Sequence, residues 1–80
     1  MRLLKIGRDA SCDIVLHSGK VSSLHAELTL LNNGDITIED KNSSNGTFIM
    51  NQPIKPGKPV KVRRGDAIRF ADCELQWSQV

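Results

Sequence analysis

The feature that most constrains this fold is an alternation of polar and apolar side chains on both sides of a tight turn signal. The alternation begins after residue 24 and resumes at Ile36 and Ile38, while residues 32–35 read Asn-Asn-Gly-Asp, a strong hairpin signal. Successive side chains on a strand face opposite sides, so this period of two indicates β structure. The two sets are Ala26, Leu28 and Leu30 on one face and His25, Glu27 and Thr29 on the other. We therefore expect an antiparallel hairpin whose apolar set faces a core.

The rest of the chain consists of short apolar segments separated by turn-forming residues, and no segment has a helical period. Leu4 and Ile6 should face the core from the first strand, and residues 51–52 should form a turn. Three prolines within residues 53–59 exclude a helix or a central strand there, so that segment should be an edge or a loop. The other expected strands are 2–6, 14–16, 47–50, 60–63, 67–70 and 73–77. In 80 residues this pattern predicts one all-β domain, a sandwich or a barrel.

The composition argues against several functions. A net charge of +2 and an aromatic content of 4% argue against nucleic-acid binding, which needs a strongly basic surface or rings that stack on bases. Cys12 and Cys73 lack the spacing of a zinc site, so we expect reduced thiols and neither a metal nor a cofactor. No apolar stretch is long enough for a signal peptide or a membrane span. We expect a cytoplasmic protein without membrane contact by this segment, which could still be cut from a larger protein.

Three polar loops carry the residues that suggest a function. Arg8 follows the first expected strand, Lys20 to Ser23 precede the hairpin, and residues 41–47 contain no apolar side chain. In a sandwich such loops gather at one end. Together they provide a guanidinium, an ammonium, hydroxyls and an amide, which are donors suited to a tetrahedral dianion. A phosphorylated amino acid, with about −1.5 to −2 charges and three acceptor oxygens, is the ligand that this set predicts.

Four short motifs occur in order along the chain. They are Gly7-Arg8, Ser22-Ser23-Leu24-His25-Ala26, Ser44-Asn45-Gly46-Thr47 and Gly65-Asp66-Ala67-Ile68. This series resembles that of the forkhead-associated (FHA) domain, and the resemblance spans nearly the whole chain. It implies a β-sandwich of two twisted sheets with recognition loops at one end. It also implies a non-catalytic signalling module that binds phosphothreonine peptides.

The resemblance implies a role for each matching position in the site. Arg8 would bind the phosphate, Ser22 would donate its hydroxyl to it, and Ser23 would add a hydrogen bond. Asn45 would hold the backbone of the bound peptide, with Ser44 beside it at the mouth of the site.

Four further positions have roles around these. Lys20 would read side chains C-terminal to the phosphothreonine, while Gly7, His25 and Gly46 would support the loops. The partner would be a protein phosphorylated by a Ser/Thr kinase. A monomeric domain would bind it with near-micromolar affinity, about −8 kcal/mol.

The chain departs from the family pattern at two points. Members often carry Arg or Lys where this chain has Ser23 and Leu24. Neutralisation of the phosphate would then rest on Arg8, with Lys20 or Lys41 as helpers. Many relatives also have a further strand before the segment that corresponds to Gly7-Arg8, so the first strand of the domain could be missing here.

Two other functions fit parts of the sequence. A scaffold that assembles with partners regardless of phosphorylation would bind through a sheet face, and the missing basic residues after Ser22 favour it. A serine hydrolase would use Ser22, His25 and Asp40 as a triad. We reject that hypothesis because no nucleophile elbow or glycine-rich oxyanion segment accompanies these residues.

Overall fold

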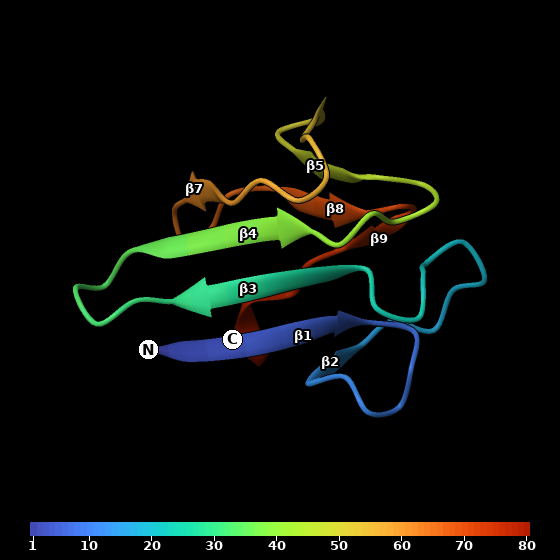
Figure 1. The fold of residues 1–80 in the computed structure, drawn as a ribbon, viewed down its shortest axis with the longest axis horizontal. Coiled ribbons are helices and arrows are strands. Elements are labelled where there is room, and N and C mark those ends of the chain that lie inside the picture. Colours follow the sequence, from blue (N-terminus) through green and yellow to red (C-terminus); the bar gives the residue numbers. More distant parts are fainter.

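The computed structural model describes all 80 residues, which form two β-sheets packed face to face (Figure 1). The first sheet has five strands in the order β2-β1-β3-β4-β7. These strands are β1 (Arg2–Gly7), β2 (Ile14–Val15), β3 (Ala26–Leu30), β4 (Ile36–Asp40) and β7 (Val60–Val62). Neighbours are antiparallel except β1 and β2, which run parallel. The all-β sandwich expected from the sequence is therefore confirmed.

The second sheet has four antiparallel strands in the order β6-β5-β8-β9 and lies behind the first in Figure 1. Its strands are β5 (Thr47–Ile49), β6 (Gln52–Pro53), β8 (Ile68–Phe70) and β9 (Cys73–Glu74). A single turn of 3-10 helix, η1 (Trp77–Gln79), follows β9. Proline lacks the N–H that a strand in the middle of a sheet needs. Pro53 is accommodated because β6 is an edge strand.

Apolar side chains from both sheets form one core. Leu28 of β3 lies between Leu4 of β1 and Ile38 of β4 in the strand register, and none of the three is more than 4% exposed. Ile68 and Phe70 close the core from the second sheet and are fully buried. The other members are Ile6, Ile14, Ala26, Ile36, Val62 and Leu75. Burial of each large side chain contributes roughly 1.5–3 kcal/mol, and this small core fixes the ends of the strands from which the loops emerge.

The hairpin predicted from the alternation is confirmed. Leu30 of β3 lies opposite Ile36 of β4 in an antiparallel register. Gly34 in the turn has a φ of +92°, which glycine adopts without steric cost. The N–H of Asp35 donates to Oδ1 of Asn33 at 2.9 Å, so the side chain of the turn stabilises its own backbone.

Three expectations from the sequence are wrong. The sequence places Gln52 in a turn, but Met50 and Asn51, both with positive φ, complete the reversal and Gln52 begins β6. The sequence places Trp77 in the last strand, but the strand ends early and Trp77 begins η1, where its indole N–H donates to the carbonyl of Asp66 at 2.8 Å. The alternation places His25 on the polar face, but it precedes β3 and is fully buried.

The polar loops after β1, β2 and β4 gather at one end of the sandwich, at the right of Figure 1. The N-terminus and the turn between β3 and β4 lie at the opposite end. The predicted clustering of the three loops is therefore confirmed. No helix of the structure has the length and apolar character needed to span a membrane.

Candidate functional site

The loop between β2 and β3, residues 16–25, lies at the centre of the candidate site and contacts Arg8. The backbone N–H of Arg8 donates to the carbonyl of Ser22 at 3.0 Å, and its Nε donates to the carbonyl of Val21 at 3.1 Å. Arg8 is exposed, and its two terminal guanidinium nitrogens have no partner within the chain. A fixed guanidinium with its outer edge free is suited to a phosphate.

Gly7 allows β1 to pass directly against this central loop. A Cβ atom at Gly7 would lie 2.2 Å from the carbonyl oxygen of Ser23, far inside contact distance. The same carbonyl accepts a hydrogen bond from the N–H of Asp9 at 3.2 Å. Ser23 and Leu24 are both exposed at the mouth of the site. Only glycine therefore fits at the end of β1, and the close approach holds Arg8 against the loop.

His25 connects the central loop with the loop that follows β4. Its Nδ1 accepts a hydrogen bond from the N–H of Ser22 at 3.1 Å, and its Nε2 lies 2.8 Å from the carbonyl oxygen of Gly46. A carbonyl oxygen can only accept, so Nε2 carries the proton. The fully buried ring also meets Phe70 edge to face, with 5.8 Å between the ring centroids. Both ring nitrogens are thus occupied in joining two loops.

Ser44 and Asn45 bring the third loop against the central one. The N–H of Ser44 donates to Oγ of Ser22 at 3.1 Å, and Nδ2 of Asn45 donates to the carbonyl of Lys20 at 2.7 Å. Both Ser44 and Asn45 are exposed. Gly46 follows with a φ of +86°, which directs the chain into β5. The amide of Asn45 is therefore fixed in direction while its oxygen stays free.

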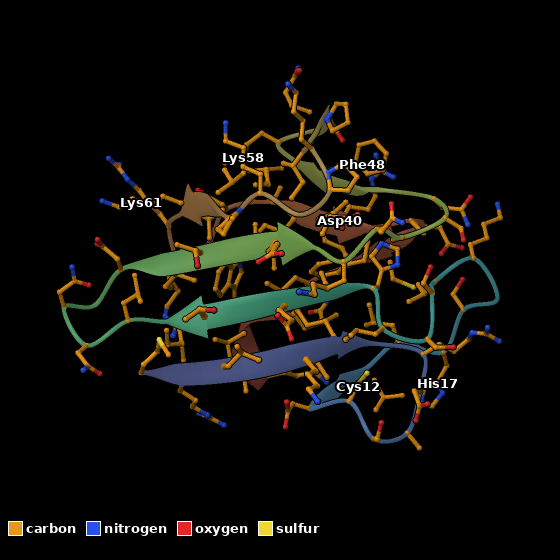
Figure 2. All side chains as sticks on the ribbon, in the orientation of Figure 1. Cys12, His17, Asp40, Phe48, Lys58 and Lys61 are labelled. Atoms are coloured by element: carbon orange, nitrogen blue, oxygen red, sulfur yellow. The ribbon has the colours of Figure 1, made fainter.

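Asp40 holds this third loop from the interior of the fold. It ends β4 in register with Ala26, so its side chain points inward and is only 1% exposed (Figure 2). Its carboxylate accepts from the hydroxyl and the N–H of Ser43, at 2.5 and 3.0 Å, and from the hydroxyl of Thr47 at 2.6 Å. Burial raises the pKa of Asp40, but these hydrogen bonds outweigh it and the pKa lies below its ordinary value. The buried carboxylate is thus fully satisfied and orders the loop.

A hollow opens beside Asn45, between the central loop and the second sheet. The guanidinium of Arg69 lies over the ring of Phe48, 4.1 Å from its centroid. Asp72 accepts a hydrogen bond from the hydroxyl of Ser18 at 2.7 Å, and this bond lowers the pKa of Asp72. The lining residues are Lys20, Asn45, Phe48, Arg69, Ala71 and Asp72. The hollow therefore offers two cations, a carboxylate and an aromatic wall.

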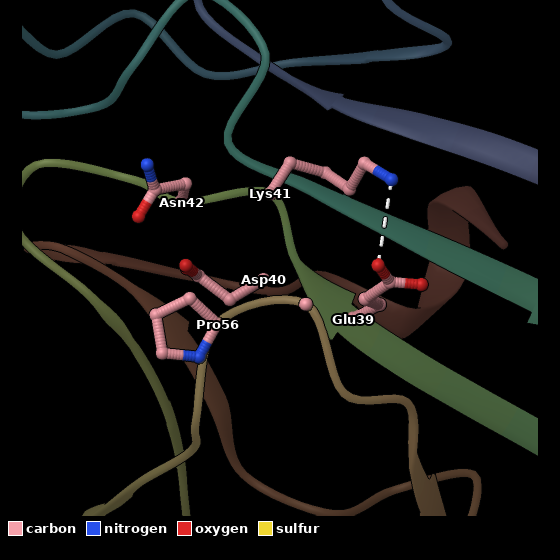
Figure 3. A pocket seen from close by; sticks show the side chains of 6 residues that line it. Glu39, Asp40, Lys41, Asn42 and Pro56 are labelled. Carbon is pink, nitrogen blue, oxygen red and sulfur yellow. Dashed lines mark hydrogen bonds and ion pairs between the residues drawn. The ribbon is translucent and has the colours of Figure 1, made fainter.

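Lys41 does not lie with Arg8 and the other groups expected to bind the phosphate, although the sequence suggested that it would help to neutralise it. Its Nζ lies 3.3 Å from Glu27 and 3.4 Å from Glu39, on the outer face of the first sheet. Figure 3 shows the side chain directed to Glu39, away from Asn42. The hydrogen bond to Glu27 and its charge raise the pKa of Lys41, as does the neighbouring Glu39. Its ammonium is therefore already neutralised.

The geometry of a hydrolase triad is absent. Nδ1 of His25 is bonded to the backbone of Ser22, not to its hydroxyl, and Oγ of Ser22 accepts from Ser44. Nε2 of His25 is 4.0 Å from Asp40, which is instead occupied by Ser43 and Thr47. No group of three or more His, Cys, Asp or Glu side chains is placed to hold a metal ion.

The residues predicted from the sequence lie together at this end of the fold. They are Gly7, Arg8, Lys20, Ser22, Ser23, His25, Ser44, Asn45 and Gly46. Sequence reasoning missed Ser43 as the partner of Asp40, although an Asp with a Ser three residues later before a tight turn is a common signal of such a bond. It also missed Arg69 and Asp72, which lie near Asn45 only because the second sheet folds over the first.

Comparison with known proteins shows which family this chain is similar to. The sequence model of the FHA domain matches residues 4–71. An Arabidopsis thaliana protein phosphatase 1 regulatory inhibitor subunit PPP1R8 homolog is 38% identical over 61 residues, which cover 76% of this chain and 16% of that protein. The chain spans less than a quarter of the length of the curated relatives that it matches.

Solved structures are similar over most of the chain. Mycobacterium tuberculosis EmbR, in complex with a low-affinity phosphopeptide, superposes with a TM-score of 0.80 at 36% identity, over 90% of this chain and 18% of that one. The N-terminal FHA domain of S. cerevisiae Rad53p, in complex with a phosphothreonine peptide, gives 0.77 at 26% identity, over 84% and 54%. On the motifs, the two-sheet fold and these matches, the chain belongs to the FHA domain family.

Proposed function

We propose that this domain binds phosphothreonine peptides at the end formed by its three polar loops and so recruits partners phosphorylated by a Ser/Thr kinase. One observation carries the proposal. The central loop bonds to Arg8 on one side and to Ser44 and Asn45 on the other, so a cation, a hydroxyl and an amide are held together at the surface. This arrangement suits a ligand that has both a phosphate and an extended backbone.

The phosphate would lie against Arg8 and Ser22. Because Oγ of Ser22 already accepts from Ser44, its own proton is free to donate to a phosphate oxygen. The guanidinium of Arg8 supplies charge and two parallel donors, while the exposed hydroxyl of Ser23 is available for a third oxygen. Hydrogen bonds to a charged group contribute roughly 1.5–3 kcal/mol each, so these few contacts are sufficient for a micromolar complex.

The peptide backbone would be held by Asn45, whose position is set by its bond to the carbonyl of Lys20. Its Oδ1 and the remaining N–H are free for the N–H and C=O groups of an extended segment. Ser44 lies beside it at the mouth. Residues C-terminal to the phosphothreonine would then extend toward the hollow with Lys20 and Arg69, where an acidic or polar side chain is favoured.

The role is binding without turnover, in a cytoplasmic setting and as a monomer. His25 and the glycines Gly7 and Gly46 would act as supports that keep the donors in place. The preference for threonine over serine would come from contacts with the extra methyl group, worth about 1 kcal/mol.

The proposal is tested by titrating the domain with a degenerate phosphothreonine peptide library and with its unphosphorylated counterpart. Arg8→Ala should abolish binding, whereas Arg2→Ala, which removes another exposed cation, at the start of β1 and outside the loops, should leave it unchanged. A phosphoserine library should bind several-fold more weakly. Equal binding of phosphorylated and unphosphorylated peptides would instead establish a scaffold that ignores phosphorylation.

A further inference from the structure

The positive charge of this chain is concentrated in one short segment outside the three polar loops. The segment approaches the third loop at Gly57, whose N–H donates to the carbonyl of Asp40 at 2.8 Å. Residues 55–64 contain five of the eleven basic residues and no acidic residue, whereas the other 70 residues carry six basic and nine acidic side chains. The net charge of +2 therefore comes entirely from this segment. We call its cations the basic edge: Lys55, Lys58, Lys61, Arg63 and Arg64.

The basic edge follows the open side of the first sheet. β7 pairs only with β4, so its other side has no neighbouring strand. Figure 2 shows Lys58 and Lys61 projecting from the loop before β7 and from β7 itself. All five side chains are exposed. The segment thus combines an open strand edge with a row of cations.

These cations have few partners within the chain. Lys61 lies 3.5 Å from Asp35, but its side chain remains 69% exposed. Arg64 lies over the ring of Trp77, 5.5 Å from its centroid. Lys55, Lys58 and Arg63 form no ion pair. The folded domain therefore leaves most of this charge unbalanced.

An apolar hollow lies beneath the end of the basic edge, on the side of the fold opposite the recognition loops. Four of its nine lining residues are apolar, and one of the others, Asp35, is a carboxylate that already pairs with Lys61 at 3.5 Å. The apolar four are Leu30, Leu31, Ile36 and Val62, and the rest are Gly34, Asp35, Lys61, Arg63 and Arg64. Its volume is about 480 Å³, enough for one large apolar side chain. An extended segment along β7 could place such a side chain here while its neighbours meet the cations.

We propose that the basic edge is a second protein-binding surface, which takes an extended acidic segment of a partner with an apolar side chain in this hollow. The lysine of β7 and the cations beside it oppose pairing with another copy of the same strand, because that would bring cation against cation. The same charges attract an acidic strand, whose main chain can pair with the open edge of β7. The surface thus selects an acidic partner over a second copy of the domain.

The surface is less suited to a nucleic acid. Binding to single strands uses aromatic rings on which bases stack, and the ring of Trp77 already has Arg64 over it at 5.5 Å and donates to the carbonyl of Asp66. A nucleic acid would also leave the apolar hollow empty. An acidic peptide makes use of the cations, the open edge and the hollow together.

The test is an NMR titration with a peptide of glutamates and aspartates around one central leucine, and with the same peptide carrying glutamine and asparagine instead. The acidic peptide should shift the amides of β7 and of the β3–β4 turn, and leave those of Ser22 and Asn45 unchanged. Lys58→Gln with Arg63→Gln should weaken it about tenfold. Arg2→Gln with Lys5→Gln removes two exposed cations elsewhere and should change affinity little; thermal unfolding checks that both variants fold.

Several outcomes would overturn the proposal. Equal weakening by both double variants would mean that only net charge matters. Tighter binding of a DNA oligonucleotide, or of vesicles with anionic lipid, than of the acidic peptide would assign the surface to those partners. Absence of any shift in β7 at millimolar peptide would remove the surface altogether. The Ser22 and Asn45 amides are observed in the same spectra. If the acidic peptide does not bind at β7, the phosphopeptide proposal is therefore unaffected and can be tested separately.

Discussion

The N–H of Ser44 donates to the hydroxyl oxygen of Ser22 at 3.1 Å and so joins two loops through a side chain that still has a proton to give. A hydroxyl that accepts from the protein on one side can donate to a ligand on the other. This bond holds the Ser22 hydroxyl without help from His25, whose two ring nitrogens contact the N–H of Ser22 and the carbonyl of Gly46. The bonding of Ser22 therefore differs from that of a catalytic serine, which would be hydrogen-bonded to the histidine, and is compatible with a role in binding.

Ser22→Ala should weaken binding of a phosphothreonine peptide about 10- to 100-fold, because a hydrogen bond to the phosphate is lost and the N–H of Ser44 loses its acceptor. Isothermal titration calorimetry measures the change. Ser78→Ala, an exposed serine in η1, is the matched control and should bind like the original domain. Unchanged affinity for the Ser22 variant would remove this hydroxyl from the phosphate site.

Gly7→Ala should destabilise the domain by about 2 kcal/mol or more, because the new Cβ would lie 2.2 Å from the carbonyl oxygen of Ser23 and one of the two backbones must move. Phosphopeptide affinity should fall as well, since Arg8 is the next residue. Chemical denaturation measures the first effect. Gly19→Ala is the control, because a Cβ at Gly19 meets no atom within 4 Å. Equal stability of both variants would show that the loop at Ser23 can move away from the new Cβ at little cost in free energy.

Asp40 should make the domain less stable at acid pH. Hydrogen bonds hold its pKa in the folded state below the ordinary 3.8, so the unfolded state takes up the proton first as pH falls. The stability from this ionised group is present above about pH 4 and is lost as pH falls toward the folded-state pKa. Asp40→Asn should therefore lower stability at pH 7 and flatten its dependence on pH between about 5 and 2.

Denaturation midpoints at a series of pH values measure this effect. Glu74→Gln, which removes one exposed carboxylate, should keep the acid loss of the original domain. If Asp40→Asn retained the full acid dependence, other carboxylates would be responsible. Asp9 and Asp72 also have lowered pKa values, through bonds from the N–H of Ser11 and the hydroxyl of Ser18.

Local chemistry explains why much of the fold could be predicted. The alternation in β3 and β4 and the Asn-Gly turn between them are encoded within a few residues, so the hairpin and its inward face followed directly. The end of β9 could not be predicted in this way. The indole N–H of Trp77 donates to the carbonyl of Asp66, eleven residues earlier, and the chain does not continue as a strand at this residue. Gln52 differed because two non-glycine residues, Met50 and Asn51, adopt positive φ, which no sequence signal requires.

The site divides along the same line. Arg8, Ser22 and Asn45 could be proposed from the sequence because their motifs are local and resemble a known family. The burial of His25 was missed because strand alternation was extended one residue beyond the strand. The place of Lys41 was also missed, since only the register of β3 with β4 puts Glu27 directly opposite Glu39 and creates the charge that Lys41 neutralises.

Lys41→Met should lower the melting temperature of the domain without changing its affinity for a phosphothreonine peptide. Glu27 and Glu39 face each other across β3 and β4, and like charges in that position repel once the shared ammonium is gone. The loss should be largest at low salt, because exposed charges are screened within about 8–10 Å at physiological ionic strength.

A second substitution separates this cause from a general packing defect. Glu39→Gln added to Lys41→Met removes the repulsion and should restore most of the melting temperature. Lys61→Met, which removes a more exposed lysine on the same face, should need no such rescue. Scanning calorimetry at low and high salt gives both values. A fall in phosphopeptide affinity with Lys41→Met would instead return this lysine to the recognition site.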